Sequence, residues 1–323
     1  MEYESMIQSV LDEIDKRITE NIHADEFARM ANYSTHHFRR VFNELTGMPF
    51  MNYITRRKLE YALYDLSQGK KIINVAMDYG FETHAGFTKA FKKQFGYPPS
   101  LYRLHIVVSP PAKAMVNNAK IRHGWLDALH LDYSCNQGGT KMQVELKEMK
   151  PFSIVGYASR HRMPGVKSMA QLPPSFYDIV NKDYVAELEA LYQVYNQFHH
   201  CEVMLCLDVD EEQGGFTYMM GVGVAEAEYT IPLRPGTYRH EISGGLYAIF
   251  TTPLTHDEDE VYTQNIALQD TWKYILEDWL PGSEYEYDDT RADYEYHDER
   301  AHSDWRDDGK CCTEIRIPIC KRK

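Results

Sequence analysis

Two clusters of side chains, all basic or polar except one alanine, have the spacing of residues that read DNA. Their members are His36, Arg39 and Arg40 in the first cluster, and His84, Ala85, Thr88, Lys89, Lys92 and Lys93 in the second. Helical residues three or four apart share a face, so each cluster forms a polar face opposite a pair of phenylalanines. Arginine pairs with base edges in the major groove, and lysine pairs with phosphates. The spacing therefore predicts two helices that contact DNA, with Lys92 and Lys93 at phosphates.

The element that must carry each cluster is a helix that recurs along the chain. The pattern Phe-x3-Phe-x4-Gly-x-Pro spans residues 38–49 and returns at residues 87–98, an offset of 49 residues. Apolar residues at helical spacing are followed by a glycine, which suits a left-handed helix end, and then by a proline, which cannot continue the helix. The repeat predicts two helices that end in the same way.

A shorter helix is predicted before each copy, over residues 25–31 and 74–79. Tight turns follow these helices, and Ser34 and Thr83 supply hydroxyl groups that can cap the next helix. A short helix, a tight turn and a longer helix form the helix-turn-helix motif. The sequence predicts this motif twice.

A helix over residues 50–67 is predicted to join the two motifs, with Arg56, Arg57 and Lys58 exposed to solvent. An amphipathic helix near the N-terminus completes an all-α bundle. We therefore expect a double helix-turn-helix DNA-binding domain over residues 1–105.

Composition and charge support a division into two domains. The 323 residues suffice for two domains, and 43% apolar and 13% aromatic residues can fill two cores. Residues 1–105 contain 14 basic and 13 acidic side chains, whereas the remainder of the chain has a net charge of -14. This asymmetry predicts a nucleic-acid-binding surface on residues 1–105 and a cation-attracting surface on the rest. No apolar run is long enough for a membrane span and no secretion signal is recognisable, so we expect no membrane partner, a cytoplasmic protein and reduced cysteines.

Residues 106–140 have little periodicity and several glycine, proline and asparagine pairs, so we predict a linker there. A domain over residues 141–323 follows, in which strands alternate with helices. The predicted strands are 144–146, 153–159, 202–207, 217–224, 247–252, 294–297 and 313–319, and the predicted helices are 176–198 and 261–280. This order recurs, which predicts a pseudo-duplicated α+β domain with curved antiparallel sheets.

The stretch 7–103 resembles the DNA-binding domain of the AraC/XylS family. The resemblance rests on ANYSTHHFRRVFNELTGMPF and on VAMDYGFETHAGFTKAFKKQFGYPPSLYR, which is close to the most diagnostic segment of the family. It implies a transcription regulator whose partners are promoter double-stranded DNA and RNA polymerase. The base-reading positions of the family fall on the first cluster and on the first four residues of the second cluster.

The C-terminal half resembles the GyrI-like effector-binding domain, of SHS2-type fold, and the order of the two domains is that of Rob-type regulators. The segments that carry this resemblance are PFSIVGYASR, TYRHEISGGLYAIFTTP, WKYILEDWLPGSEYEYDD and EIRIPI. Pockets of the family carry acidic residues at positions that match Glu295 and Glu314, and His297 stands where the family has a tyrosine. The resemblance implies a small-molecule effector. An aromatic-lined cleft with carboxylates favours an amphipathic cation.

Tyr157, Trp272 and Trp279 are the aromatic candidates for this cleft, although packing in the core is the simpler explanation of each. Both glutamates also fit exposed strand positions. The sequence has no HExxH, no GxSxG and no phosphate-binding glycine loop, so we expect no catalytic residue, no cofactor and no metal. Two alternatives stay open: a small-molecule hydrolase that uses a Glu and a Tyr in the cleft, and a DNA-architectural protein without an effector.

Overall fold

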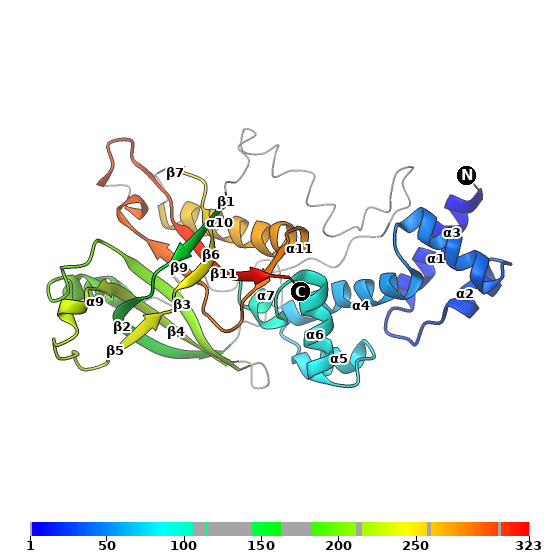
Figure 1. Ribbon diagram of the computed structural model, residues 1–323, viewed down its shortest axis with the longest axis horizontal. Coiled ribbons are helices and arrows are strands. Elements are labelled where there is room, and N and C mark those ends of the chain that lie inside the picture. The colour runs from blue at the N-terminus through cyan, green and yellow to red at the C-terminus, as the bar shows by residue number, and fades with distance from the viewer. Residues whose placement is uncertain are drawn as a thin grey trace. The chain divides into compact units, whose positions relative to one another are not determined.

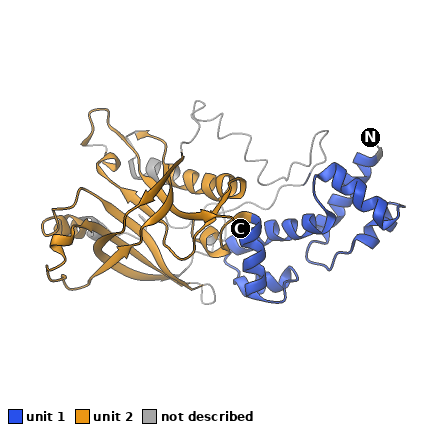
Figure 2. Ribbon diagram, viewed as in Figure 1, with its two compact units in different colours: residues 1–94, 108–141 blue, residues 95–107, 142–323 orange. Residues whose placement is uncertain are grey.

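The chain forms two compact units. A computed structural model describes residues 2–105, 114, 144–162, 182–210, 215–256, 260–302 and 305–322. One unit consists of residues 1–94 and 108–141, and the other of residues 95–107 and 142–323 (Figure 2). Apart from Ala114, the predicted linker lies outside the described residues. Within the described ranges, no helix is both long enough and apolar enough to cross a membrane.

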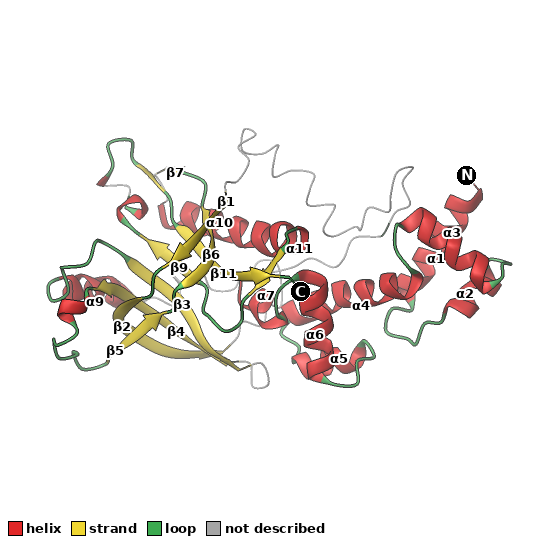
Figure 3. Ribbon diagram, viewed as in Figure 1, coloured by secondary structure: helices red, strands yellow, loops and turns green. Residues whose placement is uncertain are grey.

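The first unit is helical, as the sequence predicts (Figure 3). Its helices are α1 (Glu2–Lys16), α2 (Ala24–Met30), α3 (Thr35–Thr46), α4 (Phe50–Ser67), α5 (Ile72–Asp78) and α6 (His84–Phe95). The pairs α2–α3 and α5–α6 are the two helix-turn-helix motifs, and α4 runs between them (Figure 1). The predicted double motif is thus confirmed.

The two helices predicted to contact DNA, α3 and α6, which we call the reading helices, begin and end as their sequences require. The hydroxyls of Ser34 and Thr83 each accept a hydrogen bond from the backbone N–H three residues later, at 3.3 and 3.0 Å. These caps satisfy N–H groups that have no partner inside the helix. Gly47 and Gly96 end the helices with φ of 73° and 90°, a backbone conformation that glycine adopts without strain.

The prediction that the basic run of α4 is exposed is wrong. Arg57 is only 1% exposed, because its guanidinium donates to both carboxylate oxygens of Asp15, at 2.7 Å each, and to Glu60 at 2.8 Å. Arg56 and Lys58 are half-buried. A buried charge is stable only when it is paired, so these contacts hold α4 against α1.

The second unit is built on one antiparallel sheet. Its strands are β1 (Val144–Met149), β2 (Phe152–Arg162), β3 (Glu202–Asp210), β4 (Gly215–Val224), β5 (Thr237–Ile242), β6 (Gly245–Thr251), β8 (Tyr285–Tyr287), β9 (Tyr294–His297) and β11 (Glu314–Lys321). The order is β1-β6-β11-β9-β3-β4-β2-β5, with β8 beside β11. The halves meet where β9 pairs with β3, which confirms the predicted α+β class. The short strands β7 (Thr255–His256) and β10 (Lys310–Cys311) pair separately.

Within the described ranges, four helices accompany this sheet. They are α7 (Pro99–His105), α9 (Lys182–Tyr192), α10 (Glu260–Lys273) and α11 (Leu280–Gly282), with a π-helical turn over Tyr274–Trp279 before α11. The helix predicted to reach residue 198 ends at Tyr192, and the Glu228 carboxylate accepts hydrogen bonds from the backbone N–H groups of Asn196 and Gln197, which lie beyond this end. Residues 176–181 of that prediction lie outside the described residues. The strands β5, β7, β8 and β10 were not predicted.

Alternation along the strands divides the buried side chains between two faces of the sheet. The covered face packs under α9 and includes Leu188, Leu191, Met204, Met220, Val222 and Leu104 of α7. The inner face includes Val203, Leu205, Met219, Tyr247, Tyr294 and Tyr296. Each face therefore has its own core.

Candidate functional site

The side chains predicted to read DNA lie on α3 and α6. The exposed members are His36, Arg39, Arg40, Ala85, Lys89 and Lys93, and the half-buried members are His84, Thr88 and Lys92. Phe38 and Phe87, on the opposite sides of these helices, are fully buried. The ion pair of Arg40 with Glu44 is long, 3.9 Å, and exposed, so it holds the guanidinium weakly.

The register of β9 separates the two glutamates that the family resemblance had placed in one pocket. Glu295 lies opposite Met204, whereas Glu314 lies opposite Tyr296. Residues directly opposite in an antiparallel pair point to the same side of the sheet. Glu295 therefore belongs to the covered face and Glu314 to the inner face. One small ligand cannot contact both.

On the covered face, four residues form what we call the indole site: His105, Trp272, Asp293 and Glu295. The indole Nε1 of Trp272, on α10, donates to Oε1 of Glu295 at 3.3 Å. The imidazole of His105, the last residue of α7, stacks on this indole with ring centroids 3.5 Å apart and planes at 9°. Asp293 Oδ2 lies 3.5 Å from His105 Nε2. Both carboxyl groups are buried.

The carboxylate of Glu295 is only partly satisfied by its surroundings. The side chain is 5% exposed, and its Oε2 has no hydrogen-bond partner among the described residues. The Nε2 of His297 is 3.9 Å from this oxygen, which is beyond hydrogen-bond distance. A buried carboxylate oxygen without a partner is costly. The indole site thus combines an aromatic plane with buried negative charge, which suits a cation that carries an apolar body.

Helix α7 has a second polar anchor in this unit. The Tyr102 hydroxyl donates to Oε1 of Glu277 at 3.2 Å, in the π-helical turn after α10. Burial raises the pKa of Glu277 to about 8, because desolvation of the charged carboxylate outweighs the favourable effects of Lys273 and of the Tyr102 hydrogen bond. Glu277 is therefore largely protonated at neutral pH.

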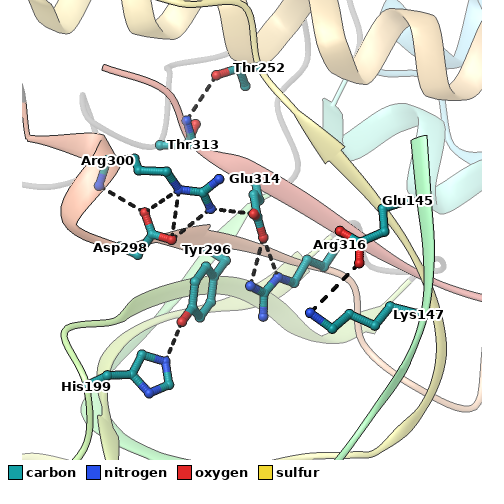
Figure 4. A network of polar contacts seen from close by, with 10 residues as sticks. All are labelled: Glu145, Lys147, His199, Thr252, Tyr296, Asp298, Arg300, Thr313, Glu314 and Arg316. Atoms are coloured by element: carbon teal, nitrogen blue, oxygen red, sulfur yellow. Dashed lines mark hydrogen bonds and ion pairs between the residues drawn. The ribbon is translucent and has the colours of Figure 1, made fainter. Parts of the chain in front are cut away.

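On the inner face, Glu314 belongs to a network of ion pairs (Figure 4). Its Oε2 accepts from Nε of Arg316 at 2.9 Å, and its Oε1 accepts from Arg300, which also donates to Asp298 at 2.7 Å. The guanidinium carbon of Arg316 lies 3.4 Å from the centre of the Tyr296 ring. Two guanidinium groups balance two carboxylates here, so the carboxylate of Glu314 already has cationic partners.

The other aromatic candidates lie away from β9. Tyr157 is half-buried on β2, three strands from β9, and packs against the covered-face core. Trp279 contacts Phe250 of β6 edge-on, with centroids 5.1 Å apart, and β6 is two strands from β9. Both residues have packing partners of their own.

Sequence reasoning missed His105 and Asp293 of the indole site, and it missed Tyr296, Asp298, Arg300 and Arg316 of the network around Glu314. A signal existed for Arg316, because its position two residues after Glu314 in a strand puts both side chains on one face. His105 has no such signal, since its partner Trp272 is distant in the chain.

Comparison with known proteins matches both halves of the chain. A model described as a helix-turn-helix domain matches residues 27–105, and one described as an integron-associated effector binding protein matches residues 145–319. The transcriptional activator AarP of Providencia stuartii is 36% identical over 101 residues, 31% of this chain and 75% of AarP. The right origin-binding protein of Escherichia coli is 33% identical over 104 residues, 32% of this chain and 36% of that protein. The integron cassette protein VCH_CASS2 of Vibrio cholerae, a solved structure, is 14% identical with a TM-score of 0.32, over 55% of this chain and 97% of that one.

We expect the chain to lose stability as the pH rises through the folded-state pKa of Glu277. The carboxyl group has an ordinary pKa of 4.5 and a folded value of about 8, so its contribution is complete below the first and lost as pH passes the second. Each unit of difference between the folded and unfolded pKa changes the free energy of unfolding by at most about 1.4 kcal/mol. Glu277→Gln, which keeps a neutral acceptor for Tyr102, should melt at a higher temperature than wild type at about pH 9 and not at about pH 4.

The matched control is Glu284→Gln, because the side chain of Glu284 is 69% exposed. Its melting temperature should follow that of wild type across the pH range. Parallel curves for wild type and Glu277→Gln would show that the buried carboxyl group does not hold its proton.

Proposed function

This chain belongs to the AraC family of helix-turn-helix transcription regulators and to the family of integron-associated effector-binding proteins, and from this we propose that an amphipathic organic cation, bound at the indole site, controls its action at promoter DNA. Membership of the two families gives a DNA-binding regulator with an effector-binding domain. The class of effector and its place are our proposal. RNA polymerase is the partner that we propose for the promoter-bound chain.

The observation that carries the proposal is the carboxylate oxygen Oε2 of Glu295, which has no hydrogen-bond partner among the described residues and lies in the same site as the stacked indole of Trp272. An organic cation on the indole would gain contact with the aromatic face and would give the buried carboxylate an opposite charge. An apolar neutral ligand would gain only the first. The acidity of the chain beyond residue 105 adds long-range attraction for cations.

Helix α7 is the element through which we propose that the effector acts on DNA binding. By sequence it closes the domain that we predict over residues 1–105, whereas Tyr102, Leu104 and His105 pack in the second unit. A cation that replaces His105 on the indole would remove one of these anchors. Because α7 follows α6 directly in the chain, a loosened α7 changes the constraint on the second reading helix. The limits 1–105, 106–140 and 141–323 remain our proposal for the domains.

Binding without conversion is the role that we propose for the effector domain. A Glu and a Tyr that could act together as in a hydrolase are Glu314 and Tyr296, which lie opposite each other. Burial raises the pKa of Tyr296, and Glu314 is bound by two arginines. A neutral phenol is a weak nucleophile, and both oxygens of the Glu314 carboxylate already accept hydrogen bonds from guanidinium groups. A DNA-architectural protein without an effector would have no use for a buried carboxylate whose Oε2 lacks a hydrogen-bond partner among the described residues, as in Glu295.

Calorimetric titration with an aromatic quaternary ammonium ion and its neutral isostere, in which carbon replaces the charged nitrogen, tests the effector site. We expect Glu295→Gln to weaken the cation by about 2 to 5 kcal/mol and the neutral compound far less, because only the cation loses a charge partner. Glu314→Gln is the matched control, since it removes the same charge from the other face. It should leave the preference for the cation intact. Equal losses for both compounds in Glu295→Gln, or loss of the preference in Glu314→Gln, would refute the assignment.

The reading helices make a separate prediction about DNA. Arg40→Ala should cost about 1 to 3 kcal/mol on the specific promoter site and little on random DNA, because a base contact is lost. Lys93→Ala, which removes a phosphate contact, should weaken both complexes alike and lower the salt slope by about 1. Electrophoretic mobility shifts at several salt concentrations measure these effects. If Arg40→Ala weakens both complexes by the same factor, Arg40 does not read bases.

A further inference from the structure

Two histidines and a glutamate from distant parts of the chain meet beside β3. The Nε2 atoms of His200 and His302 are 3.0 Å apart, and Oε1 of Glu202 lies 4.0 Å from Nε2 of His200. One nitrogen or oxygen atom from each residue thus lies within 4.8 Å of the other two. None of these residues belongs to the indole site or to the ion-pair network around Glu314.

Strand pairing brings the three side chains together. Glu202 is the first residue of β3, and His200 lies two residues before it in the chain. β9 pairs with β3, and the chain then passes through the 3-10 turn Glu299–Ala301 to reach His302. Asp298 caps this turn by accepting a hydrogen bond from the backbone, which fixes the approach of His302. The cluster therefore joins the two halves of the domain.

Aromatic neighbours orient both imidazoles before any ligand arrives. The ring of Tyr192 stacks on His200 with centroids 4.8 Å apart, and the ring of Trp305 stacks on His302 at 4.3 Å. Rings held by packing lose little freedom when they bind an ion, which is a property of preorganised metal ligands. The side chains of His200 and Glu202 are 14% and 17% exposed, so an ion can reach them from solvent.

Two imidazole nitrogens 3.0 Å apart need either a shared proton or an ion between them. A hydrogen bond would use one pair of tautomers and would leave the carboxylate of Glu202 outside the contact. An ion would use the lone pairs of both rings and the carboxylate together.

We propose that His200, Glu202 and His302 form a binding site for a divalent transition-metal ion of the zinc class. Zinc lies about 2.0 to 2.1 Å from imidazole nitrogen, and tetrahedral geometry then puts two such nitrogens roughly 3.3 Å apart. The observed 3.0 Å is close to this separation, and rotation of the Glu202 side chain brings its carboxylate to the ion. Imidazole ligands favour zinc, nickel and copper over calcium and magnesium, which prefer oxygen. Three protein ligands leave a position for water or a fourth ligand.

The proposed ion is independent of the effector and of DNA. It would tie the start of β3 to the segment after β9, and thereby the first half of the domain to the second. Because only the folded chain presents the three ligands together, the ion would raise stability in proportion to the logarithm of its concentration.

Titration of the metal-free full chain with Co²⁺ and Zn²⁺ tests the site, with the visible absorption of Co²⁺ and the heat of Zn²⁺ binding as readouts. We expect one equivalent to bind with the absorption of a low-symmetry, four- or five-coordinate site, and Zn²⁺ to raise the melting temperature. His200→Ala and His302→Ala should each weaken binding more than roughly 100-fold, beyond the loss caused by an outer-shell change. His240→Ala is the control, because His240 lies half-buried on β5, three strands from β3.

Melting temperatures without metal show whether each variant folds. If a histidine variant does not fold, Glu202→Gln is used in its place, because it keeps the size of the side chain. It should weaken Co²⁺ binding roughly tenfold or more, since a neutral amide is a poorer ligand than a carboxylate. Wild type that binds no equivalent overturns the proposal. Folded variants of the three residues that bind as tightly as His240→Ala overturn it as well, because the metal then sits at other histidines.

Discussion

The alternation of side chains along β9 is the constraint on which both faces of the effector domain depend. Successive residues of a strand point to opposite sides, so Glu295 is committed to the covered face and Tyr296 to the inner face. The partner strands repeat the division, with Met204 on the covered face and Glu314 on the inner face. A shift of one residue in register would exchange the faces. Strand pairing therefore determines the chemistry of each face together with the fold.

On each face a side chain of the protein lies against an aromatic ring beside a carboxylate. Arg316 lies over Tyr296 and pairs with Glu314, whereas His105 stacks on Trp272. Arg316 is part of β11 and cannot leave without disturbing the sheet. His105 ends a helix that follows the second helix-turn-helix motif, so its displacement needs only that helix to move. The two states are His105 stacked on the indole and His105 displaced from it, and a ligand shifts the equilibrium between them by its difference in affinity for the two. A positive charge on the effector raises its affinity for the state in which it reaches Glu295.

Local patterns in the sequence predict the helical unit well, because its signals lie within a few residues of one another. Glycine and proline mark the end of each reading helix, and strand 294–297 has the bounds that alternation predicts. The predictions that failed depend on distant partners. Burial of Arg57 requires Asp15, which no helical period reveals. The separation of Glu295 from Glu314 requires the register between two strands, whereas alternation is visible only within one strand.

Replacement of His105 by a cation on the indole of Trp272 is the central claim, and the NMR signal of the His105 ring tests it most directly. A ring stacked 3.5 Å from an indole has its protons shifted upfield, and a His105→Gln variant identifies the signal. We expect titration of the full chain with the aromatic quaternary ammonium ion to move this signal to the position of a solvated histidine, while the signal of the exposed His36 stays in place. Saturation by the cation with the His105 signal still shifted upfield would mean that the effector binds elsewhere.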